Sequence, residues 1–162
     1  HYQVRRLQHI HEPYGGLPIT YTDNNTLIYQ RFLTREEIDY DTLGNQVGID
    51  VYTVSVIKQK PGNTIPLHID RFYKLKQQNP ECIGEPVRAN IFVEDWKWGH
   101  YYLAGNSIFH QWKQGDIIQM PPNMYHTTCN SGITPKLSMT ITGVPTDKSK
   151  NLIKSKNFEY FN

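Results

Sequence analysis

Two short runs of residues carry side chains suited to binding a metal ion. In His68-Ile69-Asp70 an imidazole and a carboxylate stand two positions apart, and on a β-strand such residues point to the same face. A chain of this composition contains about 0.6 His-x-acid triplets by chance, so this run alone is weak evidence. His9-Ile10-His11-Glu12 looks similar but lies in a segment without periodic pattern, and we interpret it as surface.

The second run is more specific. Gly115, Pro121, His126 and Asn130 follow one another along the chain, at a spacing expected about 0.002 times by chance. This run resembles the second motif of the cupin superfamily, although Asn123 stands where that motif usually has glycine. Among non-glycine residues, Asn readily adopts the positive φ that such a turn requires, so we expect the turn to be kept.

The first run departs from the first cupin motif in an informative way. Gly62 stands six positions before His68, as in that motif, but the usual His-x-His is here His68-x-Asp70, and the later Glu has no clear counterpart. A His-x-Asp followed far downstream by His126 resembles the 2-His-1-carboxylate triad of non-haem Fe(II) oxygenases. Such a triad occupies one face of an octahedral ion and leaves the other face open. The resemblance implies that His68, Asp70 and His126 are metal ligands and catalytic residues.

The resemblance extends to side chains that would hold 2-oxoglutarate. Lys136-Leu137-Ser138 follows the Ser131-Gly132 turn, where the family has an Arg or Lys that pairs with the distal carboxylate of 2-oxoglutarate, often with a Ser or Thr two positions later. A buried cation needs such a partner, and Lys lacks the bidentate fork of Arg. The resemblance also suggests Arg88, Asn90 and Tyr102 as candidates for this cofactor pocket, since the aspartyl/asparaginyl hydroxylase branch has an Arg that assists a carboxylate.

The resemblance implies both a fold and an activity. The fold would be mainly β, a double-stranded β-helix (jelly roll or cupin) with one or two short N-terminal helices. The enzyme would be similar to aspartyl/asparaginyl or prolyl hydroxylases, using Fe(II), 2-oxoglutarate and dioxygen to hydroxylate a C–H bond. Its substrate would be a peptide or protein side chain or a small molecule, and it would release succinate and CO2.

Two alternatives from other classes remain open. A metal cupin that does not use 2-oxoglutarate, similar to a thiol dioxygenase or an isomerase, predicts that Lys136 points away from the metal. A non-catalytic jelly-roll module for binding or structure predicts that His68, Asp70 and His126 do not converge. Several aromatic side chains could wall a substrate pocket, although core packing is the favoured interpretation; they are Trp96, Trp98, Tyr101, Tyr102 and Trp112.

Many short strands must position these side chains. Ten Pro and eleven Gly punctuate runs rich in β-branched and aromatic residues, a pattern typical of strands. The predicted strands are residues 27–33, 47–57, 87–94, 101–104, 107–112, 116–120, 125–129 and 136–143. Such a set fits a sandwich, a jelly roll or a small barrel, and the pattern alone does not choose among them.

Helices are few. Thr34-Arg35-Glu36-Glu37 is a capping box and Gly44 is a stop signal, which together predict a helix over 35–43. A second, shorter helix is predicted from Asp70 to Gln78, because Asn79-Pro80 ends it.

The resemblance covers about residues 45–145, and the first forty residues match nothing that we would name. The segment 147–156 alternates Lys with Ser and Asn, which predicts a solvated tail with Phe158, Tyr160 and Phe161 docking back on the body. A copper site built on His1 is a remote further alternative, since it requires a mature N-terminus at that residue.

Composition limits the class of protein. The 162 residues fit one domain, with an N-terminal extension 1–44, a core barrel of about 45–145 and a polar, basic tail 146–162. A net charge of +2 gives no support for a nucleic-acid or membrane partner, and no stretch is apolar enough to span a bilayer.

Cys82 and Cys129 are too few for a disulfide scaffold and are interpreted as structural. We expect a soluble, cytoplasmic protein.

Overall fold

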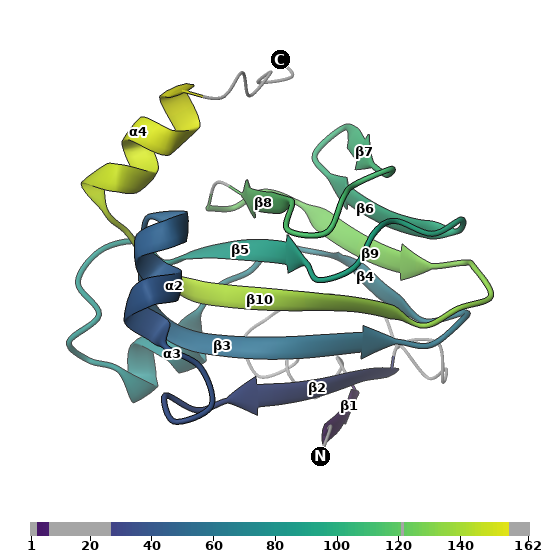
Figure 1. Ribbon diagram of the computed structural model, residues 1–162. Helices are drawn as coiled ribbons and strands as arrows, with labels where there is room; N and C mark the ends of the chain where they lie inside the picture. The colour runs from purple at the N-terminus through teal and green to yellow at the C-terminus, as the bar shows by residue number, and fades with distance from the viewer. Residues whose placement is uncertain (1–2, 7–26, 121, 156–162) are drawn as a thin grey trace.

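Two antiparallel β-sheets form the body of the molecule (Figure 1). The computed structural model describes residues 3–6, 27–120 and 122–155. The larger sheet has the order β1 (Gln3–Arg6), β2 (Leu27–Leu33), β3 (Ile49–Gln59), β10 (Lys136–Pro145), β5 (Val87–Phe92) and β8 (Ile117–Met120). The smaller sheet has the order β4 (Thr64–His68), β9 (His126–Asn130), β6 (His100–Ala104) and β7 (Ser107–Phe109).

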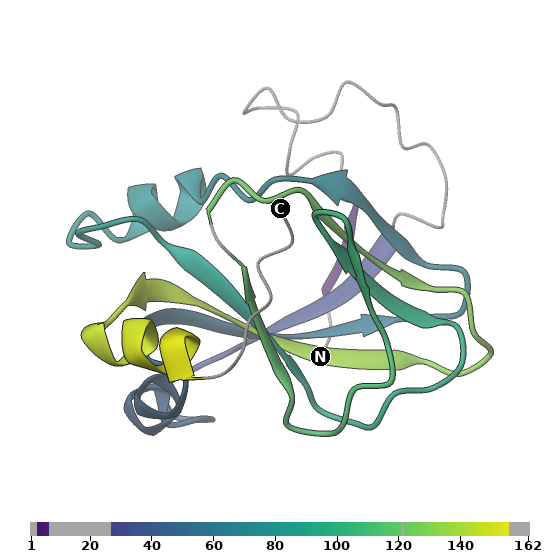
Figure 2. The same cartoon turned by 90° about the horizontal axis from the view of Figure 1, so that it is seen from above.

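The chain passes repeatedly between the two sheets, and the strand order defines a double-stranded β-helix. From β3 onward, consecutive strands alternate between the sheets, except for the β6–β7 hairpin. The smaller sheet lies toward one end of the larger one. Helices α2 (Tyr40–Val47), α3 (Tyr73–Gln78) and α4 (Asp147–Ser155) gather toward the other end (Figure 2). The expected fold class is therefore confirmed.

The larger sheet has one apolar face, which packs against helix α2. Val54, Ala89 and Ile141 are fully buried there, in one cluster with Tyr40 and Val47 of the helix. Burial of aliphatic side chains of this size stabilises the fold by about 1.5–3 kcal/mol each. This layer holds the central strands rigidly from outside the barrel.

The opposite face of the larger sheet, directed between the sheets, is unusually polar. Along β10, alternate residues share a face, so Lys136, Ser138, Thr140 and Thr142 form one column. Several of the residues that pair with this column on neighbouring strands are also polar. Lys136 pairs with Gln59, Thr140 with Ser55 and Asn90, and Thr142 with Arg88. The interior of the barrel is thus built to form hydrogen bonds as well as to exclude water.

An apolar cluster closes part of this interior. It contains Phe92, Tyr102, Trp112, Ile118 and Met120, and the rings of Phe92 and Trp112 stack with centroids 3.9 Å apart. Core packing is thus the role of Trp112.

The predicted helix over 35–43 is wrong in its position. Glu37 does reach back to the Thr34 amide at 2.9 Å, as a capping box requires, but only one turn forms. A new helix begins after Asp39. The Asp39 carboxylate accepts hydrogen bonds from the amides of Asp41 and Thr42 and caps the N-terminus of α2. This helix ends at Gly48, which has a left-handed φ of 73°, and not at Gly44.

The eight predicted strands are all present, with ends shifted by three residues or fewer. Two strands were missed. One is the short β1, and the other is β4, which contains Pro66 within its five residues. Proline argues against a central strand, but β4 lies at the edge of the smaller sheet, where a missing amide donor is tolerated. This missed strand carries His68.

The predicted second helix is present as the shorter α3, which ends at Gln78 with Asn79 as its C-cap. The segment 147–155, expected to be a solvated tail, forms helix α4; Asp147, Lys148 and Lys150 are exposed, whereas Ser149 is buried and hydrogen-bonds with Gln119. The predicted docking of Phe158, Tyr160 and Phe161, the run His9 to Glu12 and His1 all lie outside the described residues. None of the described helices is long and apolar enough to cross a membrane.

Candidate metal centre

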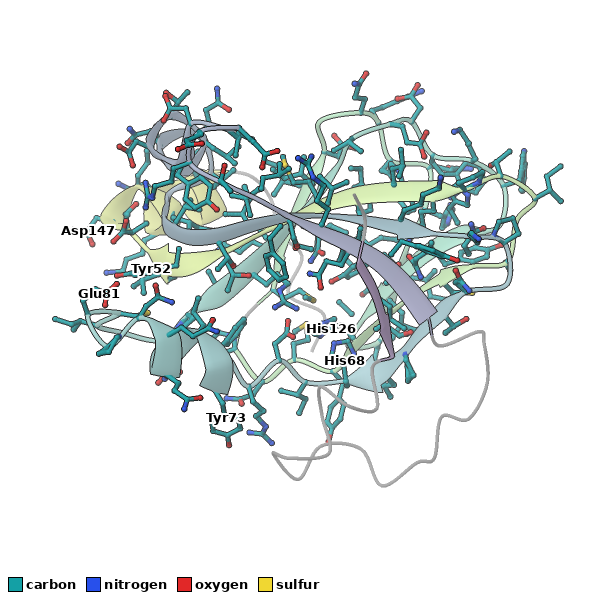
Figure 3. All side chains as sticks on the ribbon, turned by 90° about the horizontal axis from the view of Figure 1, so that it is seen from below. Tyr52, His68, Tyr73, Glu81, His126 and Asp147 are labelled. Atoms are coloured by element: carbon teal, nitrogen blue, oxygen red, sulfur yellow. The ribbon has the colours of Figure 1, made fainter. Side chains whose placement is uncertain are left out.

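The structure brings His68, Asp70 and His126 together. His68 ends β4 and His126 begins β9, and the two residues face each other as a cross-strand pair with ring centroids 4.2 Å apart. Figure 3 shows both imidazoles near the middle of the molecule, away from the labelled surface residues. One potential ligand atom from each of the three side chains lies within 4.8 Å of the other two.

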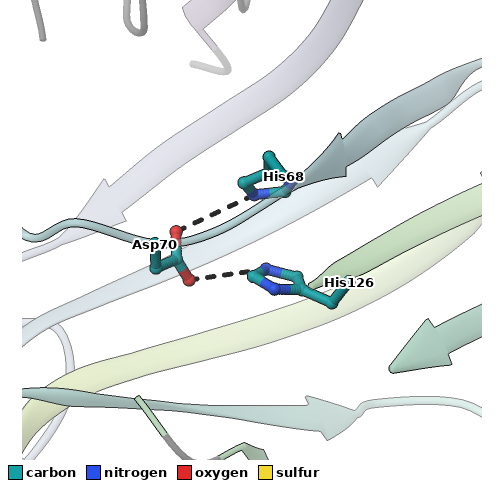
Figure 4. A group of neighbouring side chains, drawn as sticks. All are labelled: His68, Asp70 and His126. Atoms are coloured by element: carbon teal, nitrogen blue, oxygen red, sulfur yellow. Dashed lines mark ion pairs between the residues drawn. The ribbon is translucent and has the colours of Figure 1, made fainter. Parts of the chain in front are cut away.

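Asp70 does not reach this site in the expected way. Strand β4 ends at His68, so the alternation of a strand cannot place Asp70 beside it. The carboxylate instead comes from the loop after the strand, and it lies beside the two rings with one oxygen directed toward each (Figure 4). Its Oδ1 is 3.8 Å from His68 Nε2, and its Oδ2 is 3.5 Å from His126 Nε2.

Backbone carbonyls fix the tautomer of both histidines. His68 Nδ1 lies 2.7 Å from the Pro66 carbonyl, and His126 Nδ1 lies 3.0 Å from the Met124 carbonyl. Because a carbonyl oxygen only accepts, each Nδ1 must carry the proton and donate it. In a neutral ring the lone pair is then on Nε2, the atom that faces Asp70. This carbonyl-to-imidazole arrangement is typical of metal-ligating histidines.

The resulting cluster of electron pairs fits a cation. Two imidazole lone pairs and an ionised carboxylate point at one another within a buried site, and like partial charges repel unless a positive ion lies between them. Ligands at about 2.1 Å from an ion in cis positions are about 3 Å apart, so the observed 3.5 and 3.8 Å separations require only small movements. One carboxylate with two imidazoles suits a divalent transition metal.

The electrostatics of His126 also favour ligation. Burial lowers the pKa of His126 below its ordinary value, and the Asp70 carboxylate only partly opposes this effect. His126 is therefore neutral at physiological pH, the state in which an imidazole binds a metal.

Arg88 contacts the triad directly. Its Nη1 donates to Asp70 Oδ1 at 2.8 Å, and its Nε donates to Thr142 Oγ1 at 3.3 Å. The sequence placed Arg88 in a cofactor pocket, whereas in this structure its partner is a candidate metal ligand. No sequence signal indicated Thr142 apart from its place in the alternation of β10.

Asn90 and Tyr102 form the wall next to His126. The Tyr102 ring lies parallel to the His126 ring with centroids 6.3 Å apart. Asn90 Nδ2 donates to Tyr102 Oη at 2.8 Å, and the hydroxyl donates to Met120 Sδ at 3.2 Å. Burial raises the pKa of Tyr102 far above its ordinary value, so this phenol stays neutral and serves as a hydrogen-bonding wall.

Lys136 points into the barrel. It is 1% exposed, and its Nζ donates to the Tyr101 carbonyl at 2.8 Å and to Thr128 Oγ1. Thr128 stands two residues after His126 on β9 and so shares its face. Neither hydrogen-bond partner of its Nζ belongs to the triad, so the inward direction of Lys136 does not exclude the metal cupin that lacks 2-oxoglutarate. Ser138, one step along β10 on the same face, is half-buried.

A small hollow opens beside the triad. Asp70, Arg88 and His126 line it together with mainly apolar neighbours, which are Phe72, Val87, Met120, Pro122, Asn123 and Met124. Its volume of about 10 Å³ admits roughly one water molecule. Lys136 is not among the described residues that line it.

The remaining motif residues shape turns. Asn123 has a φ of 66°, as its place in the motif predicted, and Gly115 and Gly62 have φ of 90° and 83°. Asn130 is fully buried, and its Nδ2 donates to the carbonyls of Gln59 and Thr134. The motif asparagine therefore holds the β9–β10 turn and does not contact the triad.

The other predicted wall residues do not line the hollow. Trp98 is 80% exposed, Tyr101 faces outward on β6, and Trp96 donates its indole proton to the His100 carbonyl. Cys82 and Cys129 are both free thiols.

Comparisons with known proteins find similar solved structures but no matching family. No family model and no curated protein matches the sequence. Similar solved structures include a protein from Thermotoga maritima described as a predicted oxalate decarboxylase (13% identity, 73% of this chain and 81% of that chain, TM-score 0.48). An RmlC-like cupin from Shewanella frigidimarina (13%, 76% and 80%, 0.45) and the Schizosaccharomyces pombe Cnp3 cupin domain (12%, 81% and 74%, 0.46) are also similar.

Two of these neighbours are described as cupins, and similarities this weak say nothing of activity. The strand order itself defines the class of fold as a double-stranded β-helix. Within that class, any activity has to be argued from the chain's own site.

Proposed function

We propose that this protein is an Fe(II)- and 2-oxoglutarate-dependent oxygenase that hydroxylates a C–H bond of a peptide or protein side chain or of a small molecule. His68, Asp70 and His126 would hold the ion, because two imidazoles and one carboxylate are the donor set of mononuclear ferrous oxygenases. Dioxygen would be the oxidant: one of its oxygen atoms would enter the succinate formed as 2-oxoglutarate loses CO2, the other would enter the hydroxylated substrate, and the bound iron would supply the redox chemistry. The protein's own side chains would orient the reactants and exclude water.

The observation that supports 2-oxoglutarate as the co-substrate is the burial of the cationic side chain of Lys136. No described carboxylate forms an ion pair with it, and its Nζ has only a carbonyl and a hydroxyl as partners. Burial without a counter-charge lowers the pKa of Lys136 to about 7. The distal carboxylate of a dicarboxylic acid would supply the missing charge and restore the ammonium form.

The position of Lys136 supports this role. Its Nζ is 6.0 Å from the centroid of the Tyr102 ring, which is in turn 6.3 Å from that of His126, so about 12 Å is the upper limit between ammonium and imidazole. The polar side chains of Thr128, Ser138 and Asn90 occupy the same interior. A dicarboxylate bound at the triad would extend through this polar interior toward Lys136, after Tyr102 and its neighbours repack.

A second candidate, a mononuclear metal cupin that does not take 2-oxoglutarate, is favoured by one observation. The hollow beside the triad does not include Lys136 among its described lining residues, and the ammonium already has two hydrogen-bond partners. In this case Lys136 is a structural residue and the small hollow is the whole substrate site.

A pair of ligands separates the two candidates. We would titrate 2-oxoglutarate and 2-oxobutyrate, which lacks the distal carboxylate, into protein loaded with redox-stable Mn(II), using calorimetry. The proposal predicts that Lys136→Met weakens 2-oxoglutarate binding by roughly 10- to 100-fold, the loss expected for a charged hydrogen bond, and leaves 2-oxobutyrate binding unchanged. Lys113→Met, at an exposed lysine, is the matched control. Equal affinity of the wild type for both ligands would favour the second candidate.

A further inference from the structure

We propose that Arg88 is a positioning residue for the candidate metal ligand Asp70, and that it makes this carboxylate bind an ion through one oxygen only. The inference rests on the metal centre of the proposed function but not on the identity of the co-substrate. Arg88 belongs to β5 of the larger sheet, whereas Asp70 follows β4 of the smaller sheet. Their ion pair therefore joins the two sheets at the site.

The two oxygens of Asp70 have different neighbours. Oδ1 accepts a charge-assisted hydrogen bond from Arg88 Nη1 at 2.8 Å. Oδ2 lies 3.5 Å from His126 Nε2, the atom that carries the lone pair of that ring. A carboxylate can bind a metal through one oxygen or both, and the guanidinium occupies the oxygen that a two-oxygen mode would need.

Two further contacts hold the guanidinium in place. Thr142 on β10 accepts from Nε at 3.3 Å, and the ring of Phe72 lies 5.5 Å from the guanidinium carbon. Phe72 has a φ of 54°, in the left-handed region that non-glycine residues seldom adopt. This strained residue stands just after Asp70, and its conformation directs the ring beneath Arg88.

Stability alone does not explain such an arrangement. The Arg88 side chain is 31% exposed, and partly exposed ion pairs contribute little to the free energy of unfolding. The ion pair matters more for the geometry of Asp70, because it determines how many of the two carboxylate oxygens would bind an ion. If Asp70 supplies one oxygen, three of the six positions of an octahedral ion stay open, whereas two-oxygen binding leaves two. A two-atom chelating co-substrate together with dioxygen needs three.

Co(II) binding tests this role without any turnover. Visible absorption bands of Co(II) report coordination number, and their growth during a titration gives Kd. We expect Arg88→Met to change the band shape and to raise the Kd for Co(II) about 10-fold, as is common for partners of metal ligands. Arg88→Lys, which keeps a charge and a donor, should recover part of both effects.

Two further variants separate orientation from charge. Thr142→Val keeps Arg88 and its charge but removes the acceptor of Nε, so the positioning role predicts a smaller band change in the same direction. Arg71→Gln removes an exposed cation that donates to Asn123 Oδ1 at 3.4 Å, and it should leave Kd and bands unchanged. Melting curves of the metal-free variants verify that each is folded.

The outcomes are distinct. If Arg88→Met keeps the wild-type bands, or binds Co(II) more tightly because a repelling charge is gone, the positioning role is overturned while the metal centre stands. If the wild-type protein takes up no Co(II), the metal centre fails, and the proposed function fails with it.

Discussion

Replacing Lys136 with Met tests the buried cation in the barrel interior. The pKa of Lys136 falls from an ordinary 10.5 to about 7, chiefly because burial disfavours the ammonium. Below pH 7 the folded and unfolded chains both carry this proton, so the desolvation cost lowers the free energy of unfolding by its full amount. A shift of about 3.5 pKa units corresponds to about 5 kcal/mol.

The sign of the pH dependence follows from counting protons. Between pH 7 and 10.5 the unfolded chain binds the proton and the folded chain does not, so the free energy of unfolding of the wild type rises with pH. Met binds no proton. The advantage of Lys136→Met is therefore about 5 kcal/mol at pH 6, about 2 kcal/mol at pH 9 and close to zero at pH 11.

Loss of the hydrogen bonds of Lys136 offsets only part of this gain. When the ammonium is gone, the Thr128 hydroxyl lies 3.1 Å from both the Tyr101 carbonyl and Gln59 Oε1 and can donate its single proton to either one. Met also has a length and flexibility close to those of the lysine stem, which suits a buried site.

Urea unfolding at pH 6, 9 and 11 without added ligand measures the effect. The difference between Lys136→Met and wild type isolates this residue, because all other titrating groups are shared. Lys113→Met should differ from the wild type by no more than about 0.5 kcal/mol at each pH. A variant less stable than the wild type at pH 6, or a difference that does not change with pH, would refute the reasoning.

Three other substitutions test separate parts of the account. Tyr102→Phe should lower the free energy of unfolding by about 1–3 kcal/mol, because Asn90 Nδ2 loses its acceptor in a buried site; urea unfolding measures this, and unchanged stability would contradict it. Asp70→Asn should weaken Co(II) binding by at least about 100-fold, as followed by absorption, and wild-type affinity would remove Asp70 from the ligand set. Gly132→Ala places a Cβ 2.2 Å from the Trp98 carbonyl oxygen and should destabilise the fold by about 3 kcal/mol, visible in thermal unfolding; an unchanged melting temperature would show that the two loops move apart freely.

Much of the barrel could be predicted from local sequence because its strands alternate and its turns use Gly and Asn. The helix near residue 40 shows the limit of this approach. The capping box at Thr34 forms its hydrogen bond, yet Asp39 begins a better helix one turn later. A local signal says that a helix can start, and packing of Tyr40 and Val47 on the sheet decides where it does.

The triad could be predicted from residue type and spacing, but not its geometry. His68 lies on a strand that was not predicted because it contains Pro66. Asp70 reaches the site from a loop. The two residues are therefore close together, but not because of the strand alternation that the sequence predicted. The ion pair of Arg88 with Asp70 depends on how the two sheets face each other. A periodic pattern places a residue on a face, whereas the partner across the barrel depends on tertiary packing.

An anaerobic titration with Fe(II) and then 2-oxoglutarate tests the proposed function most directly. The account predicts a visible metal-to-ligand charge-transfer band in the wild type, which is absent in Asp70→Ala and needs much more 2-oxoglutarate in Lys136→Met. Iron binding without such a band at saturating 2-oxoglutarate would contradict the proposal that 2-oxoglutarate is the co-substrate. A failure of the wild type to bind iron at all would contradict the metal centre itself.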